Sequence, residues 1–156
     1  MSDLEEHDEA LKNGSIVSPL FTLIQAVASR DMATAEAQLA DDIEWDQMPY
    51  NKKVKGKQDV MKWMKTGSAD QKKPEIFNDF MGCDWGVLEY WNVGTVSPEL
   101  IAFGKVRRWP FPKDPESLVG QTYRVAQCFV YHLDNCRKID LMRQYLDAGS
   151  IWAQFR

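Results

Sequence analysis

The fold of this chain is decided by residues 121–147, which read QTYRVAQCFVYHLDNCRKIDLMRQYLD. The first half is dense in β-branched and aromatic residues, and the second half alternates between apolar and polar residues, as strands do. Asp134 and Asn135 lie between the halves and favour a turn. The run therefore predicts two long strands joined by a short polar turn. The second strand ends at Asp147, an acid that a strand end would direct into a cavity.

Helices are predicted on the N-terminal side of this run. Ser18 and Pro19 favour a helix start, as an N-cap and a first helical residue. Apolar residues then recur at i, i+3 and i+4 spacing as far as Arg30, a pattern that indicates one buried face. A shorter helix is predicted from Asp31, and a third helix follows the polar loop that ends at Gly56.

Strands are predicted between and after these helices. Residues 41–47, DDIEWDQ, predict a short strand that Pro49 ends, because proline cannot donate to a sheet ladder. Further strands are predicted over residues 76–92, with an interruption near Gly82, and over residues 99–109. Residues 148–155 predict a terminal helical turn. Helices followed by antiparallel strands indicate an α+β domain, in which a curved antiparallel sheet wraps around helices to form a cone with an internal pocket.

The length of 156 residues predicts one domain with one sizeable core. Residues 1–15 are rich in Glu and Asp and are interpreted as a mobile acidic leader, which leaves residues 16–156 as the single folded domain.

Composition excludes several classes of partner. The net charge of -4 argues against nucleic acid and anionic membrane, both of which select basic surfaces. No apolar run approaches the roughly 20 residues of a membrane span. The three cysteines share no CxxC spacing, so neither a disulfide framework nor a zinc site is predicted, and a reduced cytoplasmic compartment fits best. Phosphate-binding glycine loops, nucleophile elbows and metal-ligand patterns are missing from the sequence, which favours chemistry without a cofactor or a metal.

Three stretches together suggest a family: ADDIEWDQMP at residues 40–49, GKQDVMKWM at residues 56–64 and KIDLMRQYLD at residues 138–147. In this order the chain resembles the NTF2-like (cystatin-like α+β cone) superfamily, and within it the SnoaL-like and limonene-1,2-epoxide hydrolase-like proteins. The resemblance covers about residues 17–147. It implies the cone fold, a small hydrophobic ligand inside the cone, and a homodimer formed through the outer sheet face, where exposed apolar residues such as Phe129 or Tyr131 would serve.

The resemblance also implies site residues. In limonene-epoxide hydrolase-like enzymes the first strand ends with a Tyr and an Asn that hold the nucleophilic water, and Trp45 and Gln47 match them here. Gln47 keeps the amide, whereas the indole of Trp45 only donates and is interpreted as a pocket wall. The acid that activates this water matches Asp147.

The middle strand departs from the family pattern. The family carries an Arg and an acid there, and the matching positions hold Lys105 and Arg107, or Arg108 if the register slips by one. If these cations share the cone with Asp147, a neighbouring guanidinium keeps that carboxylate ionised, and the cations stabilise a developing enolate or alkoxide. Such a trio suits isomerisation, cyclisation or dehydration, and a Lys of lowered pKa would still allow epoxide opening.

Two functions therefore remain open. The first is a cofactor-independent enzyme that acts on a polyketide- or terpenoid-like molecule, with Asp147 as the base and Arg107 and Lys105 as electrostatic stabilisers. The second is a binding or assembly module without catalysis, in which the three charges pair tightly or Trp45 and Trp91 fill the cavity.

Two tyrosines complete the candidate substrate-binding residues. Tyr50 either donates to a substrate oxygen at the cavity mouth or lies on a surface loop. Tyr145 lies on a strand whose inner face the sequence leaves open, because a shift of one residue reverses the two faces.

Overall fold

The computed structural model describes residues 17–67 and 74–155, so the predicted acidic leader lies outside the described residues. Five α-helices and six strands are present in this part of the chain, together with two short 3-10 helices, η1 and η2. Their order is α2 (Pro19–Ala28), α3 (Met32–Ala37), β1 (Leu39–Gln47), η1 (Met48–Tyr50), β2 (Lys52–Lys55), α4 (Lys57–Gly67), β3 (Glu75–Met81), β4 (Trp85–Thr95), α5 (Pro98–Val106), η2 (Pro115–Leu118), β5 (Thr122–Leu133), β6 (Ile139–Leu146) and α6 (Ala148–Ala153). None of the helices in the described ranges is long and apolar enough to cross a membrane.

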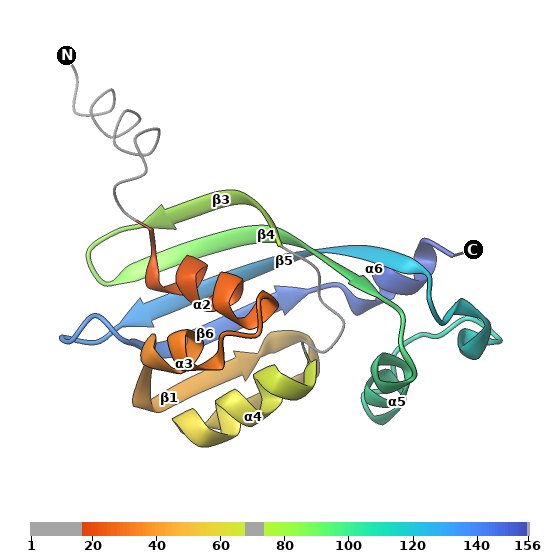
Figure 1. The fold of residues 1–156 in the computed structure, drawn as a ribbon, viewed down its shortest axis with the longest axis horizontal. Helices are drawn as coiled ribbons and strands as arrows, with labels where there is room; N and C mark the ends of the chain where they lie inside the picture. Colours follow the sequence, from red (N-terminus) through yellow and green to blue (C-terminus); the bar gives the residue numbers. More distant parts are fainter. Residues whose placement is uncertain (1–16, 68–73, 156) are drawn as a thin grey trace, which may run out of the picture.

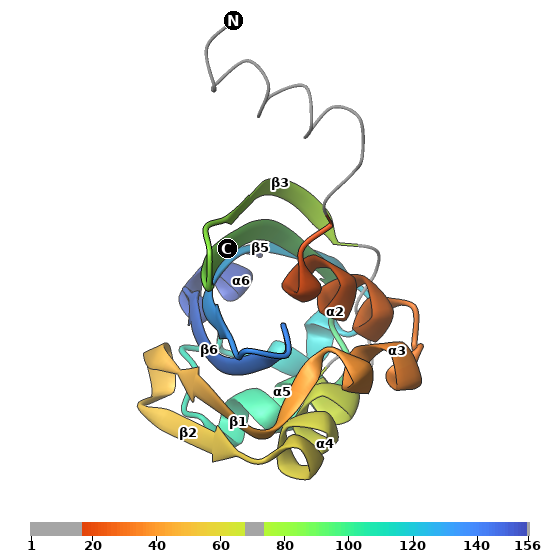
Figure 2. The ribbon, with the colours of Figure 1, turned by 90° about the vertical axis from the view of Figure 1, so that its left-hand side faces the viewer.

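The six strands form one mixed sheet in the order β2-β1-β6-β5-β4-β3. All neighbouring pairs are antiparallel except β1 and β6, which run parallel. The sheet curls around helix α2 without closing into a barrel, as the end-on view of Figure 2 shows. The predicted α+β cone is therefore confirmed, with one parallel pair in a sheet that was predicted to be antiparallel.

Strands β5 and β6 are the predicted pair of residues 121–147, and the polar turn between them is where the sequence placed it. Burial alternates strictly along β5, so every second side chain faces the inside of the cone. Phe129 and Tyr131 belong to the inner set and are fully buried, which corrects their predicted exposure on the outer face.

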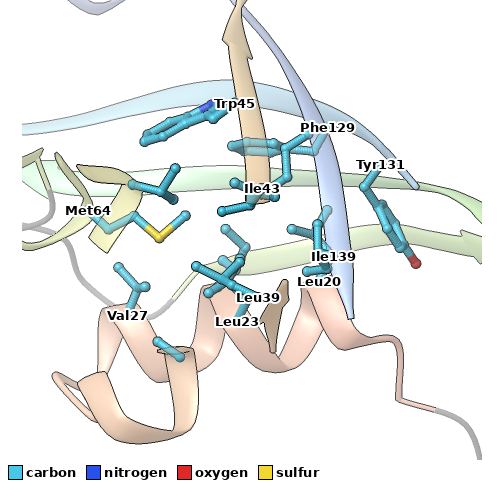
Figure 3. Close-up of a cluster of buried hydrophobic side chains, with 14 of the residues drawn as sticks. Leu20, Leu23, Val27, Leu39, Ile43, Trp45, Met64, Phe129, Tyr131 and Ile139 are labelled. Carbon is cyan, nitrogen blue, oxygen red and sulfur yellow. The ribbon is translucent and has the colours of Figure 1, made fainter. Parts of the chain in front are cut away.

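Helix α2 supplies the centre of the main core. Ser18 caps its first turn by accepting a hydrogen bond from the backbone N–H of Phe21 at 3.1 Å, as the Ser-Pro signal predicted. Leu20 and Leu23 point from the helix toward the inner faces of β1, β5 and β6, where they meet Ile43 (Figure 3). This packing fills the space between helix α2 and the curled sheet.

A second, smaller core lies at the other end of the sheet. Helices α5 and α6 both lie at this end of the molecule (Figure 1). Trp152 of α6 is fully buried and packs with Ile101 of α5 and Leu118 of η2. The predicted terminal helical turn is thus confirmed as α6.

The strand predicted over residues 99–109 is wrong, because Pro98–Val106 form helix α5. Ser97 starts this helix by accepting a hydrogen bond from the backbone N–H of Leu100 at 3.0 Å, and Pro98 occupies its first turn. The segment before α4 also differs from its prediction as a polar loop, since Lys52–Lys55 pair with β1 as the edge strand β2.

Gly86 on β4 lets Tyr131 of β5 cross the sheet surface at close range. A Cβ atom at Gly86 would lie 2.2 Å from Cζ of the Tyr131 ring, well inside van der Waals contact. In contrast, a Cβ atom at Gly82 would find its nearest neighbour, the backbone oxygen of Trp85, at 3.5 Å.

Gly86→Ala is therefore expected to lower the free energy of unfolding by about 1–3 kcal/mol, because the added methyl group overpacks the core against a ring that has no room to move. The matched control Gly82→Ala should change it by less than about 0.5 kcal/mol. Urea denaturation of both variants measures the difference. Equal values for the two variants would contradict the close approach of Tyr131.

Candidate functional site

The inner face of the sheet and helices α2, α4 and α5 enclose a cavity of about 150 Å³. Its wall is mainly aromatic and aliphatic, with Val27 from α2, Met64 from α4, Val125 from β5 and Phe103 from α5 among the lining residues. Pockets that are apolar with a few converging polar groups are the usual sites of small-molecule binding. The cavity is therefore the candidate site of this protein.

A row of neutral polar side chains crosses the cavity wall from β4 to β1. The hydroxyl of Tyr90 donates to Oε1 of Gln127 at 3.1 Å, and Nε2 of Gln144 donates to the same oxygen at 2.8 Å. Gln144 pairs in register with Gln47 on β1. Tyr90, Gln127 and Gln47 are all at least 93% buried. Burial raises the pKa of Tyr90, so its hydroxyl keeps its proton at neutral pH and remains a donor.

The mouth of the cavity lies between η1 and the segment that follows α5. Nε1 of Trp109 donates to the hydroxyl of Tyr50 at 3.1 Å, and the two rings stack with their centroids 6.3 Å apart. Burial raises the pKa of Tyr50. This contact joins two segments that are 59 residues apart in the sequence and fixes one side of the opening.

Arg107 lies at the same mouth, where it forms the C-cap of α5. Its Nη2 donates to Oε1 of Gln47 at 3.3 Å, so the guanidinium touches the end of the neutral polar row. Three cavity-lining rings surround it: its Cζ lies 3.5 Å from the ring centre of Phe103, 4.4 Å from that of Trp63 and 5.3 Å from that of Tyr50. Burial lowers the pKa of Arg107, although a guanidinium remains charged at neutral pH.

The three residues predicted as catalytic do not meet in the structure, and none of them lines the cavity. Asp147 is exposed and accepts a hydrogen bond from the backbone N–H of Gly149 at 2.9 Å, which makes it the N-cap of α6. Lys105 is exposed on α5 and forms an ion pair with Glu116 at 2.5 Å. The separation has a simple cause: a helix stands where a strand was predicted, so Lys105 and Arg107 do not project from the sheet.

The five residues predicted to bind substrate divide into two groups. Trp45, Gln47 and Tyr50 line the cavity. Trp91 and Tyr145 lie on the outer face instead, because their neighbours in sequence take the inward positions of the alternation. On that face the ring centre of Trp91 lies 6.0 Å from that of Phe77. Tyr145 is 42% exposed.

Sequence reasoning missed Tyr90, Gln127 and Gln144. A signal for Gln127 exists, since it occupies an inward position between Val125 and Phe129 on the strand that decides the fold. A polar residue within an otherwise apolar inward set marks a buried hydrogen-bonding group.

Few charged side chains of the described residues line the cavity. Among the described residues that line the cavity, the one carboxylate is Glu99, which is exposed in the first turn of α5. Over residues 17–67 and 74–155, no group of His, Cys, Asp and Glu side chains is arranged to hold a metal ion. The arrangement suits hydrogen bonding to a neutral oxygen or nitrogen of a ligand inside the cavity, with positive charge at the mouth.

No protein-family model matches the chain, and no curated protein sequence matches it. Solved structures do match. An LEH-like epoxide hydrolase of Mycobacterium tuberculosis has a TM-score of 0.63 at 14% identity, with 86% of this chain and 84% of that chain covered. RV0760c of the same organism, solved in complex with estradiol-17beta-hemisuccinate, has a TM-score of 0.62 at 18% identity, with 86% and 98% covered.

An NTF2-like protein of unknown function from Cytophaga hutchinsonii has a TM-score of 0.57 at 15% identity, with 92% of this chain and 99% of that chain covered. At such identities the likeness is one of fold. It agrees with the curled six-stranded sheet and the helices that cross its inner face. The chain therefore has the NTF2-like α+β cone fold.

Proposed function

We propose that the protein binds a small, largely apolar molecule in this cavity without transforming it. The neutral polar row carries the proposal, because Gln127 and Gln144 offer hydrogen bonds to a ligand while the cavity wall around them is aromatic. With its oxygen already accepting two hydrogen bonds, Gln127 has its amide nitrogen left to donate to a ligand.

The aromatic side chains of the cavity wall also indicate which class of ligand the cavity would bind. Ring compounds of polyketide or terpenoid type fit an aromatic cavity because flat apolar surfaces pack well against aromatic side chains. RV0760c, which has the same fold, was solved with a steroid ester, and this supports a ring-bearing ligand.

Val125→Phe is expected to weaken the binding of 2-naphthamide, a neutral ring probe, by more than about tenfold, because the larger side chain fills the space that the probe needs. Quenching of tryptophan fluorescence measures the affinity, since Trp45, Trp63 and Trp109 line the cavity. The matched control is Ala126→Phe, whose side chain projects from the other face of β5 and should leave the affinity within about twofold. An equal loss in both variants would count against binding in the cavity.

One observation favours the predicted enzyme as a second candidate. The amide nitrogen of Gln127, which is buried in the cavity wall, would donate to a developing oxyanion on a carbonyl or epoxide substrate. The catalytic roles of Asp147, Arg107 and Lys105 stay predictions, and the exposed position of Asp147 is the reason that binding alone is preferred.

Limonene 1,2-epoxide separates the two candidates. Under the binding proposal, hydrolysis in the presence of the protein should equal the rate in buffer, and Asp147→Asn should alter the affinity for 2-naphthamide by less than about twofold, because a surface cap residue acts only locally. Gas chromatography of the diol product gives the rate. Turnover by the wild type that Asp147→Asn abolishes would overturn the binding proposal in favour of the enzyme.

We also propose that the chain forms a homodimer through the outer sheet face. Phe77, Phe80 and Trp85 are exposed there by 55%, 60% and 46%, and large exposed rings on one face mark an interaction surface. A second copy of the chain fits because an isologous interface pairs the same apolar patch with itself.

Cys83 and Cys136 are free and exposed, which supports the predicted cytoplasmic location.

Phe80→Glu is expected to turn this dimer into a monomer, because two carboxylates would be desolvated across the two-fold axis. Sedimentation velocity of the wild type and the variant measures the change in mass. Asp59→Lys on helix α4, another charge change at an exposed position, serves as the control and should leave the dimer intact. A wild type that sediments as a monomer would refute the interface.

A further inference from the structure

Two cations converge on one indole at the cavity mouth. Nζ of Lys52 lies 3.7 Å from the ring centre of Trp63, and Cζ of Arg107 lies 4.4 Å from the same centre. Burial lowers the pKa of Lys52, and the charge of Arg107 adds to this effect. The two positive charges therefore act on each other, and an anion bound beside them would offset that repulsion.

The neighbours of Lys52 on β2 show how unusual its environment is. Lys53 and Lys55 both form ion pairs with Glu44, at 2.8 and 2.7 Å. Lys52 instead turns toward Trp63, and no carboxylate of the described residues forms an ion pair with it. The carboxylates on this edge of the sheet therefore form their ion pairs with the other two lysines.

Arg124 is a useful comparison for Arg107, because both guanidinium groups stack on an indole but only that of Arg124 has a carboxylate partner among the described residues. Its guanidinium also stacks on an indole, that of Trp91 at 4.2 Å, but it forms an ion pair with Glu75 as well. Arg107 is more buried than Arg124, yet within the described ranges no carboxylate pairs with it. A partly buried charge without a counterion is costly, and contacts with aromatic faces compensate for only part of that cost.

The donors of Arg107 are largely unused. A guanidinium has five N–H donors, and the one hydrogen bond within the described residues goes from Nη2 to Gln47 at 3.3 Å. The Nε atom is buried and has no acceptor there. Stacking occupies the flat faces of the group, whereas oxyanions bind to its edge, which carries the N–H donors.

A role in stacking alone would explain the position of Arg107 on Phe103, but not the second cation on Trp63 nor the missing counterions. Among the described residues of the cavity lining, the one carboxylate is Glu99, which lies at the start of α5, whereas Arg107 lies at its end, about 12 Å away along the helix. Positive charge is therefore concentrated at one side of the mouth.

We infer that the ligand of this cavity carries a carboxylate, which binds Arg107 and Lys52 at the mouth while its apolar body lies inside. The inference rests on the proposed binding function and narrows its ligand to an apolar carboxylic acid. The planar edge of Arg107 matches a carboxylate in a two-point hydrogen bond, and the ammonium of Lys52 adds a second positive charge.

The test compares 2-naphthoate with 2-naphthamide, two probes of nearly the same shape that differ in charge. The full-length wild type should bind 2-naphthoate at least about tenfold more tightly in calorimetric titration, because hydrogen bonds to charged groups are the stronger ones. Raising the salt concentration should weaken the binding of 2-naphthoate and leave that of 2-naphthamide nearly unchanged.

Three variants assign the preference to its residues. Arg107→Met should abolish the preference for 2-naphthoate over 2-naphthamide, because the guanidinium that binds the carboxylate is removed. Lys52→Gln, on an exposed edge strand, should reduce the preference by about threefold and provides the test if Arg107→Met does not fold. Lys62→Gln, which removes one positive charge from an exposed position on α4, should change neither affinity.

The outcomes separate the two proposals. Equal affinity of the wild type for both probes, or a preference that survives in both Arg107→Met and Lys52→Gln, would overturn the inference and leave the binding function standing. Failure of both probes to bind would overturn the binding function, and the inference with it.

Discussion

The alternation of side chains along β5 is the constraint on which the rest of the structure depends. Its inward residues are Tyr123, Val125, Gln127, Phe129, Tyr131 and Leu133, and they run from the cavity end of the sheet to the main core around helix α2. A shift of one residue would place Arg124 and Ala126 inside and remove the core and the cavity wall together. Full pairing with β4 over eleven residues, and with β6 on the other side, holds this register in place.

The distribution of polarity follows from that register. Deep in the cone, where burying a charge would be costly, the hydrogen-bonded polar groups are a phenol and amides, with Gln127 accepting from both Tyr90 and Gln144. At the mouth, Arg107 has aromatic faces around it and is half-buried. Selectivity for a ligand then has two separate sources: ring packing and neutral hydrogen bonds inside, and electrostatic attraction at the opening.

Local signals explain what could be predicted from the sequence. The two strands of residues 121–147 and the helix after Ser18 were predicted because β-branched alternation and a Ser-Pro start are features of the local sequence. Helix α5 has the same start, Ser97 followed by Pro98, but the segment after it was predicted as a strand, which placed Lys105 and Arg107 on the sheet. Trp91 and Tyr145 lie on the outer face for another reason: pairing with distant residues, such as that of Trp91 with Ala126, determines which face of a strand points inward. The mouth joins η1 to Trp109 across 59 residues, and no short stretch of sequence records such a contact.

A crystal structure of the protein with bound 2-naphthoate would show where the ring and its carboxylate lie. The naphthalene ring is predicted to lie in the cavity against Phe103 and Val125, with its carboxylate within hydrogen-bonding distance of the Arg107 guanidinium. A cavity that stays empty while the probe occupies the outer sheet face, or a ring bound inside with its carboxylate turned away from Arg107, would contradict it.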